Sequence, residues 1–111
     1  MPQNGVPVPA YAIVDVDVLD EEAGLAYAPV AQRTILDHGG RYLVAGPTPE
    51  AVEGTWESSR FTVIEFPDMA RLRRWYDSPE YRRARELREG AVRVRMLFVE
   101  GSPPEGFTLP S

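Results

Sequence analysis

Four short stretches of the chain carry apolar residues in the manner of β-strands. In residues 11–18, Val14, Val16 and Val18 alternate with Asp15 and Asp17, and this period of two predicts a half-buried strand. Residues 41–45, 60–66 and 94–99 are further short apolar runs, each followed within two residues by glycine or proline. We therefore expect four strands, separated by turns and longer connections.

A first helix is expected between the first two strands. Asp20, followed by two glutamates, is typical of a helix N-cap, and the helix should run to about His38 and end at Gly39. Pro29 lies inside this stretch, so the helix should either kink there or begin only near Tyr27.

A second helical stretch is expected between the last two strands. Asp68 is the predicted N-cap, and the helix should run through Tyr76. The serine–proline pair at residues 78–79 then predicts a restart, with Ser78 as N-cap and proline at the first helical position. The restarted helix should continue to about Glu89, with Gly90 as its cap.

The order strand, helix, strand thus occurs twice, which is typical of the split βαβ arrangement. We expect an α+β, ferredoxin-like βαββαβ fold, with a four-stranded antiparallel sheet and two helices on one face. The domain should span residues 10–101. Residues 1–9 should form a flexible lead, and residues 102–111, which are rich in proline, an extended tail.

Two helices can cover only one face of such a sheet, yet both faces are apolar. Ala12, Val14, Val16, Val18, Ile64 and Phe66 should lie under the helices. The opposite row contains Tyr11, Ile13, Phe61 and Val63, and residues 94–99 are apolar on both faces. A second copy of the chain should therefore cover this face in a homodimer with a two-fold interface. The alternative is that the C-terminal tail folds back over it.

Composition narrows the partners and the compartment. The 111 residues fit one domain, and the net charge of −5 is unsuited to phosphate contacts, so no nucleic acid partner is expected. Cysteine is absent, which removes thiolate chemistry and disulfides. The first ten residues lack the features of a signal peptide, and no apolar stretch is long enough for a membrane span. We expect a soluble, cytoplasmic protein without a membrane partner.

Five segments resemble, in the same order, the bacterial family called domain of unknown function 1330 (DUF1330). They are residues 39–44 (GGRYLV), 53–54 (EG), 63–67 (VIEFP), 75–81 (WYDSPEY) and 99–101 (VEG), and the fourth is the most specific. The similarity covers about residues 10–101. It implies the dimeric α+β barrel superfamily, which includes small cofactor-free monooxygenases, isomerases and dehalogenase-like enzymes as well as proteins of no known activity.

Two departures from the family pattern bear on the ligand. Members usually carry a basic residue and paired glycines after the second strand, where this chain has Ala45, Gly46 and Pro47. Members also tend to have proline before the third strand, where this chain has Ser58 and Ser59. If the basic residue binds an anionic ligand in the family, the ligand here should differ. The family has no agreed catalytic residues to transfer.

Asp15 and Glu65 are the candidate catalytic residues, because both fall on the half-apolar face and their strands should be neighbours. A carboxylate on an apolar wall tends to have a raised pKa, which suits a general acid or base. The alternative is that each is ion-paired, with Arg41 or Arg95, or hydrated. The candidate ligand-binding residues are Arg41, Arg95, Tyr11, Phe61, Trp75 and Tyr81. No metal site is expected, since His38 is the single histidine.

These features lead to two functional hypotheses. The first is a cofactor-free enzyme, similar to a monooxygenase, isomerase or cyclase, that acts on a small, partly apolar organic molecule in the barrel cleft. Asp15 or Glu65 would move a proton, Arg41 or Arg95 would hold a carboxylate or enolate oxygen, and the aromatic residues would pack the ring. The alternative is a dimeric module that binds a small ligand or serves a structural role without catalysis.

Overall fold

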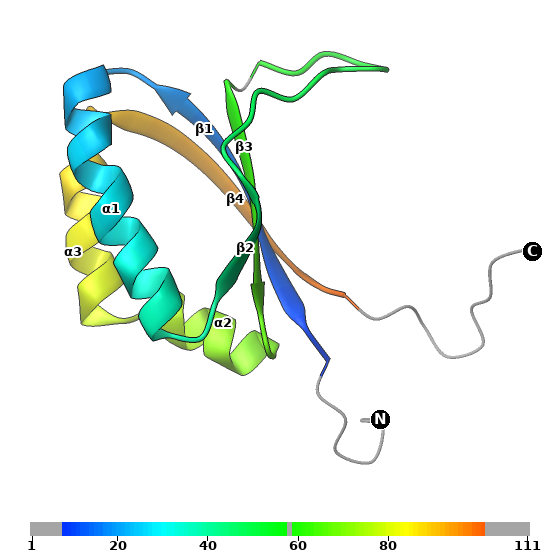
Figure 1. Cartoon of the computed structure of the whole chain (residues 1–111), viewed down its shortest axis with the longest axis vertical. Coiled ribbons are helices and arrows are strands. Elements are labelled where there is room, and N and C mark those ends of the chain that lie inside the picture. The colour runs from blue at the N-terminus through cyan, green and yellow to red at the C-terminus, as the bar shows by residue number, and fades with distance from the viewer. Residues whose placement is uncertain (1–7, 58, 102–111) are drawn as a thin grey trace, which may run out of the picture.

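The computed structural model describes residues 8–57 and 59–101. Its elements, in chain order, are β1 (Ala10–Val18), α1 (Glu21–Asp37), β2 (Arg41–Ala45), β3 (Arg60–Phe66), α2 (Met69–Tyr76), α3 (Pro79–Arg88) and β4 (Val92–Glu100). The strands form one antiparallel sheet in the order β2-β3-β1-β4, with the helices on one side of it (Figure 1). The predicted ferredoxin-like α+β fold is confirmed.

Helix α1 begins where the sequence places its N-cap and continues through the proline. The Asp20 carboxylate accepts a hydrogen bond from the Ala23 backbone at 3.1 Å, which satisfies one free N–H of the first turn. The alternative of a start near Tyr27 is therefore wrong. Pro29 removes the bond that its own N–H would give to the carbonyl of Leu25, and the helix tolerates that loss.

The second helical stretch consists of two helices, as the serine–proline pair predicts. The Asp68 carboxylate caps α2 by accepting from the Arg71 backbone at 2.8 Å. The Ser78 hydroxyl accepts from the Tyr81 backbone at 3.1 Å and donates to the Trp75 carbonyl at 2.7 Å, so one side chain ends α2 and starts α3. Within the described residues, no helix is long and apolar enough to cross a membrane.

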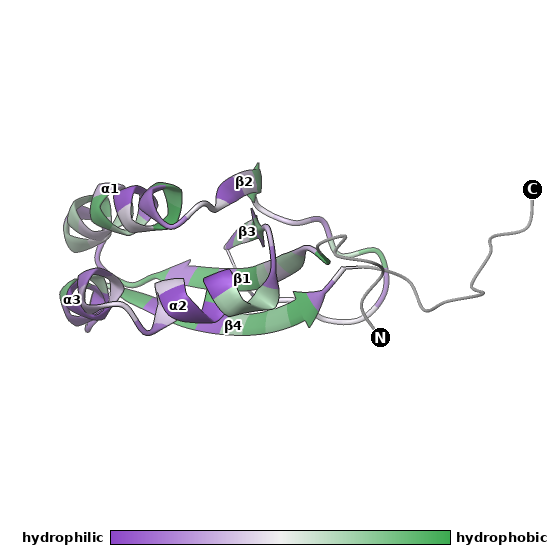
Figure 2. Cartoon of the chain, turned by 90° about the horizontal axis from the view of Figure 1, so that it is seen from below, coloured by the Kyte–Doolittle hydropathy of each residue, from purple (hydrophilic) through white to green (hydrophobic). Residues whose placement is uncertain are grey.

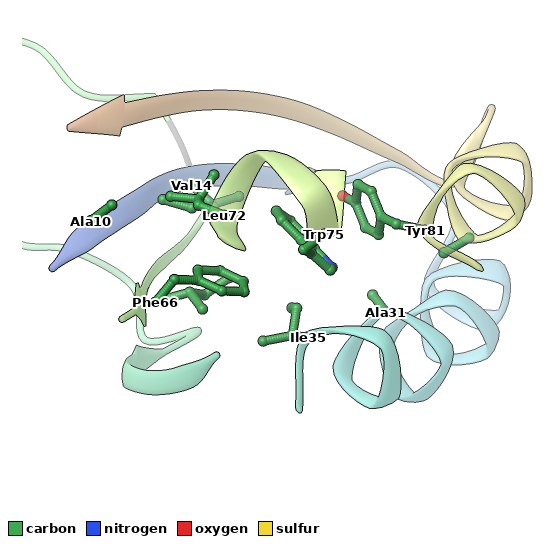
Figure 3. Packing of buried hydrophobic residues seen from close by; sticks show 11 residues of the cluster. Ala10, Val14, Ala31, Ile35, Phe66, Leu72, Trp75 and Tyr81 are labelled. Carbon is green, nitrogen blue, oxygen red and sulfur yellow. The ribbon is translucent and has the colours of Figure 1, made fainter. Parts of the chain in front are cut away.

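The core lies between the helices and one face of the sheet. Its largest fully buried side chains are Trp75, Tyr81, Phe66 and Leu72 (Figure 3). Trp75 stacks on Phe66 with ring centroids 5.4 Å apart and lies 4.3 Å from the ring of Tyr81. Its indole N–H donates to the Thr34 hydroxyl at 3.0 Å, which ties α2 to α1. The row under the helices is the predicted one, because Ala12, Val14, Ile64 and Phe66 are all buried.

The other face of the sheet has no cover among the described residues. Leu97 and Val99 of β4 are 65% and 43% exposed there, and much of β4 is hydrophobic (Figure 2). We call this surface, formed by the outward-facing side chains of all four strands, the open face. The C-terminal tail, which the sequence offers as an alternative cover, lies outside the described residues. Residues 1–7 of the predicted lead also lie outside them.

Replacing Thr34 by valine should destabilise the fold, because the buried Trp75 N–H would lose its acceptor while the side-chain volume stays nearly the same. The expected loss is about 1–3 kcal/mol in the free energy of unfolding, measured by urea denaturation. Thr48→Val is the matched control, since the Thr48 hydroxyl donates to the Ser59 carbonyl at an exposed site. The control should change stability by less than about 0.5 kcal/mol. Equal effects of the two substitutions would contradict the role given to the indole hydrogen bond.

Candidate functional site

A cavity of about 550 Å³ lies between α1 and the helix-facing side of the sheet. Its walls are mainly aliphatic and come from all four strands and all three helices, among them Val14, Val16, Ile64, Met96 and Ala31. The exposed residues Leu25, Ala28 and Gln32 also line it, so the cavity opens to solvent along α1. Its volume falls within the range of small-molecule sites, which is about 300–1,000 Å³.

The cavity exists because α1 approaches the sheet closely at its two ends and carries small side chains between them. Near the start of α1, a Cβ on Gly24 would lie 3.4 Å from a Val18 methyl. Just after its end, a Cβ on Gly40 would lie 2.8 Å from both Ile35 and Phe66, which leaves room only for glycine. Ala28 and Ala31 occupy the middle of the helix on the cavity side. Short side chains at these positions leave the space unfilled.

Hydroxyl groups of three tyrosines and of Thr62 supply the polar groups inside the cavity. The Tyr27 and Tyr81 hydroxyl oxygens are 3.1 Å apart, and an Arg88 N–H donates to the Tyr81 hydroxyl at 2.9 Å. Tyr42 enters from β2, and burial raises its pKa to about 12, with a smaller contribution from Tyr27. Burial also raises the pKa of Tyr81. The hydroxyls of Tyr42 and Tyr81 are therefore neutral near pH 7 and can donate hydrogen bonds.

Charged groups lie at the rim of the cavity rather than inside it. Glu21 and Arg60 are both exposed, and Gln32 lies with them at the surface. No described carboxylate, histidine or arginine other than these two lines the cavity. A ligand would accordingly meet an apolar interior with neutral hydroxyl groups and would meet charge only at the entrance.

The residues predicted for one site lie on two faces of the sheet. Trp75 and Tyr81 are buried in the core and also line the cavity. The helix-facing row of β1 consists of Ala10, Ala12 and Val14, and successive residues of a strand point to opposite sides. The other six predicted residues are therefore on the open face: Asp15, Glu65, Arg41, Arg95, Tyr11 and Phe61. The expectation that all eight share one cleft is therefore wrong within a single protomer. The catalytic role given to Asp15 and Glu65 stays a prediction.

Ion pairs on the open face match the alternative interpretation of the carboxylates. An Arg41 N–H donates to Glu65 at 2.7 Å, and an Arg95 N–H donates to Asp15 at 3.1 Å. The bond from Arg41 is the main reason why the pKa of Glu65 lies below its usual value, and the Tyr11 hydroxyl lowers it further by donating at 3.1 Å. The raised pKa that an apolar wall would cause is therefore absent at Glu65.

Asp15 and Glu65 lie on adjacent strands but not beside each other. The register between β1 and β3 places Asp15 opposite Phe61 and Glu65 opposite Tyr11. Four residues along the strand separate the two positions, which is about 13 Å at the usual rise. The two carboxylates therefore cannot act as a close acid–base pair on one small substrate. A small hollow of about 270 Å³ lies beside Arg41 and Glu65.

One atom on the open face is left without a partner. The Oδ1 oxygen of Asp15 is buried and has no hydrogen-bond donor among the described residues, while Oδ2 accepts from Arg95. A buried acceptor without a donor costs on the order of 1–3 kcal/mol. This position on the open face therefore calls for a donor that the described part of the protomer does not supply.

Sequence analysis missed two tyrosines that line the cavity and an arginine behind its wall. The tyrosines are Tyr27 and Tyr42, and the arginine is Arg88, which donates to the Tyr81 hydroxyl. Tyr27 could have been found, because Tyr27, Ala31 and Thr34 have the spacing of one helix face, and Thr34 is buried. Tyr42 and Arg88 carry no comparable signal. Within the described part of the chain, no group of three or more histidine, cysteine, aspartate or glutamate side chains is placed to hold a metal ion.

Comparison with solved structures shows the same fold in proteins of low sequence identity. A protein of unknown function from Rhodopseudomonas palustris superposes with a TM-score of 0.73 at 20% identity, covering 88% of this chain and 85% of that one. SnoaB, a cofactor-independent oxygenase from Streptomyces nogalater, gives a TM-score of 0.61 at 7% identity, covering 90% and 99%. A proposed antibiotic biosynthesis monooxygenase from Nitrosomonas europaea gives 0.55 at 12%, covering 90% and 96%.

These likenesses establish the fold alone, since all three identities are low. No protein with a curated description matches the sequence. The model of a protein family, by contrast, matches residues 9–102, which is nearly the whole of the described domain, and the family is the one that the WYDSPEY and VIEFP segments resemble. The chain is therefore a member of the family described as domain of unknown function (DUF1330).

Proposed function

We propose that this protein is a cofactor-free enzyme that binds a small, partly apolar organic molecule in the cavity between α1 and the sheet. The observation that carries the proposal is the cavity itself: about 550 Å³ of mainly aliphatic space with a few neutral hydroxyl groups. A planar or bicyclic molecule with one or two oxygen atoms fits this chemistry. The similarity of fold to SnoaB, described as a cofactor-independent oxygenase, supports turnover as well as binding.

Binding without turnover is the second candidate, and one observation favours it. The charged groups at the cavity, Glu21 and Arg60, are exposed at the rim, and no described carboxylate or histidine lines the interior to act as a general acid or base. If the protein is an enzyme, the tyrosine hydroxyls are the groups placed to touch the substrate. Incubation of the protein with a compound that binds, with chromatography to measure whether the compound is converted to a product, distinguishes an enzyme from a binding protein.

We also infer that two copies pair through their open faces to form the homodimer. Leu97 lies 65% exposed in the protomer, opposite Ile13 across the β1–β4 ladder, and Ile13 is opposite Val63 in β3. Three apolar side chains in adjacent positions form a band that a two-fold partner would remove from water. The unpaired oxygen of Asp15 lies on the same face, where a donor from the partner could reach it. The dimer leaves the cavity free, because the cavity lies on the opposite side of the sheet.

Ala28→Trp should abolish ligand binding, because an indole at the cavity mouth blocks entry, while a bulky residue at this exposed position does not overfill the core. Naphthol, coumarin and naphthoquinone are the probes, each measured by the rise in thermal unfolding temperature. A probe at a hundred times its dissociation constant stabilises the wild type by about 2.7 kcal/mol. Ala26→Trp is the control, since Ala26 is exposed on the same helix and does not line the cavity. If every probe leaves the wild type unshifted, or if the two variants behave alike, the cavity is not the binding site.

Leu97→Glu should convert the dimer to a monomer. The two-fold interface would carry the substitution twice, and each new carboxylate would be buried against an apolar band. We expect the dimer dissociation constant to rise at least roughly a hundredfold, as for a central interface residue. Sedimentation equilibrium at micromolar concentration is the measurement. Leu36→Glu is the control on α1, since Leu36 is 52% exposed and remote from the open face. A wild type that sediments as a monomer rules out the proposed interface.

A further inference from the structure

Three side chains from two helices form a hydrogen-bonded chain that ends at the cavity. Arg88, in the last turn of α3, donates from Nη1 to the hydroxyl of Tyr81 at 2.9 Å. Tyr81, in the first turn of the same helix, is 1% exposed, and its hydroxyl oxygen lies 3.1 Å from that of Tyr27 on α1. Tyr27 is only partly buried and lines the cavity.

The number of donor hydrogens on Arg88, Tyr81 and Tyr27 determines how many hydrogen bonds these side chains can give to a ligand. Arg88 only donates, because a guanidinium has no acceptor and keeps its charge at every accessible pH. Each phenol brings one hydrogen, and only one of the two is used in the contact between Tyr27 and Tyr81. One hydroxyl hydrogen therefore has no acceptor in the chain.

Burial decides which tyrosine carries the free hydrogen. Tyr81 is enclosed by the rings of Trp75 and Tyr76, and an unsatisfied hydroxyl there would bear the full cost of desolvation. If Tyr81 accepts from Arg88 and donates to Tyr27, its hydroxyl is satisfied. The hydrogen of Tyr27 is then free at the cavity wall, where a ligand or solvent can accept it.

We infer that the hydroxyl of Tyr27 is a hydrogen-bond donor of the cavity, oriented through Tyr81 by the charge of Arg88, and that it binds a carbonyl or enolate oxygen of the ligand. Tyr27 is the ligand-binding group, and Tyr81 and Arg88 are positioning residues. A chain that begins at a cation polarises each hydroxyl along it, so its last hydrogen bond is stronger than that of an isolated phenol. This inference rests on the proposed function, since it names the group that recognises the ligand of that cavity.

The ligand class follows from the same geometry. The donor stands on an apolar wall and faces an interior without a carboxylate or ammonium group, so it favours a neutral ketone or quinone, or an enolate whose charge is spread over a ring. An aliphatic amine would find no acceptor of opposite charge except Glu21 at the rim. The ligand is thus expected to be a flat, largely apolar molecule with a carbonyl or enol oxygen at one edge.

Indanone and indane separate recognition of the oxygen atom from filling of the cavity. They have the same bicyclic frame, and only indanone carries a carbonyl. Binding of each to the wild type and to variants is measured by ligand-observed nuclear magnetic resonance. Tyr27→Phe should weaken indanone roughly threefold to tenfold, the worth of one hydrogen bond, and should change indane by less than about twofold.

Variants of Arg88 test whether its hydrogen bond to Tyr81 orients the Tyr27 hydroxyl. Arg88→Met should weaken indanone selectively as well, and Arg88→Lys should recover most of that loss, because an ammonium can still donate to Tyr81. Tyr76→Phe is the matched control, since Tyr76 packs on Tyr81 but does not line the cavity. It should leave the binding of both probes unchanged.

The outcomes separate this inference from the function on which it rests. If neither probe binds the wild type, the proposed cavity function fails and the donor role falls with it. If both probes bind and Tyr27→Phe weakens both equally or neither, the cavity binds ligands but Tyr27 is not its donor. A selective loss for indanone in Tyr27→Phe and Arg88→Met, with recovery in Arg88→Lys, is the supporting result.

Discussion

The packing of Trp75 between Phe66 and Tyr81 is the contact on which the rest of this structure depends. The three rings fill one part of the space between the helices and the sheet, and the indole N–H of Trp75 holds α1 through Thr34. Because the aromatic rings fill one part of the layer between helices and sheet, α1 keeps its position although it carries small alanine side chains over the cavity. Tyr81 belongs both to the packed cluster and to the wall of the cavity, so the same ring supports the fold and positions the candidate site.

The two faces of the sheet differ in the groups that they carry. The helix face holds the cavity and its neutral hydroxyl groups, whereas the open face holds an apolar band flanked by arginine–carboxylate pairs. In each of those pairs the carboxylate is the less exposed partner and the guanidinium reaches toward solvent. Such an arrangement suits a surface that a second copy covers, because the arginines can turn to meet groups of the partner. Under the proposed function, the ligand and the second copy would lie on opposite sides of one sheet.

The candidate carboxylates and the cavity lie on opposite faces of the sheet. A carboxylate in a cleft would suggest proton transfer by Asp15 or Glu65, but Glu65 is held in its charged form by Arg41 and Tyr11 on the open face. The cavity offers hydroxyl donors instead. A donor toward a carbonyl or enolate oxygen stabilises negative charge as it develops, which is the contribution that cofactor-free chemistry on an activated ring requires from a protein. SnoaB shares the fold, and the family to which the chain belongs is described as a domain of unknown function.

The sequence by itself determined the elements, their order and the family. The caps at Asp20, Asp68 and Ser78 act locally, and their hydrogen bonds reach only three residues along the chain, so their effect can be recognised from neighbouring residues. Strand alternation is equally local, and it placed Ala12 and Val14 under the helices correctly. The helix through Pro29 was the one element that the sequence left open. A proline inside a helix lowers its stability, but packing at both ends of α1 can outweigh that cost.

Only the tertiary structure decided where a ligand can be held. The cavity depends on how far α1 stands from the sheet, and that distance is set by close approaches between residues far apart in sequence, such as Gly24 to Val92 and Gly40 to Phe66. The hydrogen bonds from Arg88 through Tyr81 to Tyr27 join two helices, and Tyr27 and Tyr81 are 54 positions apart, so no spacing along the sequence reveals them. Sequence patterns report which face a residue prefers, but the volume left between two faces is a property of the packed molecule.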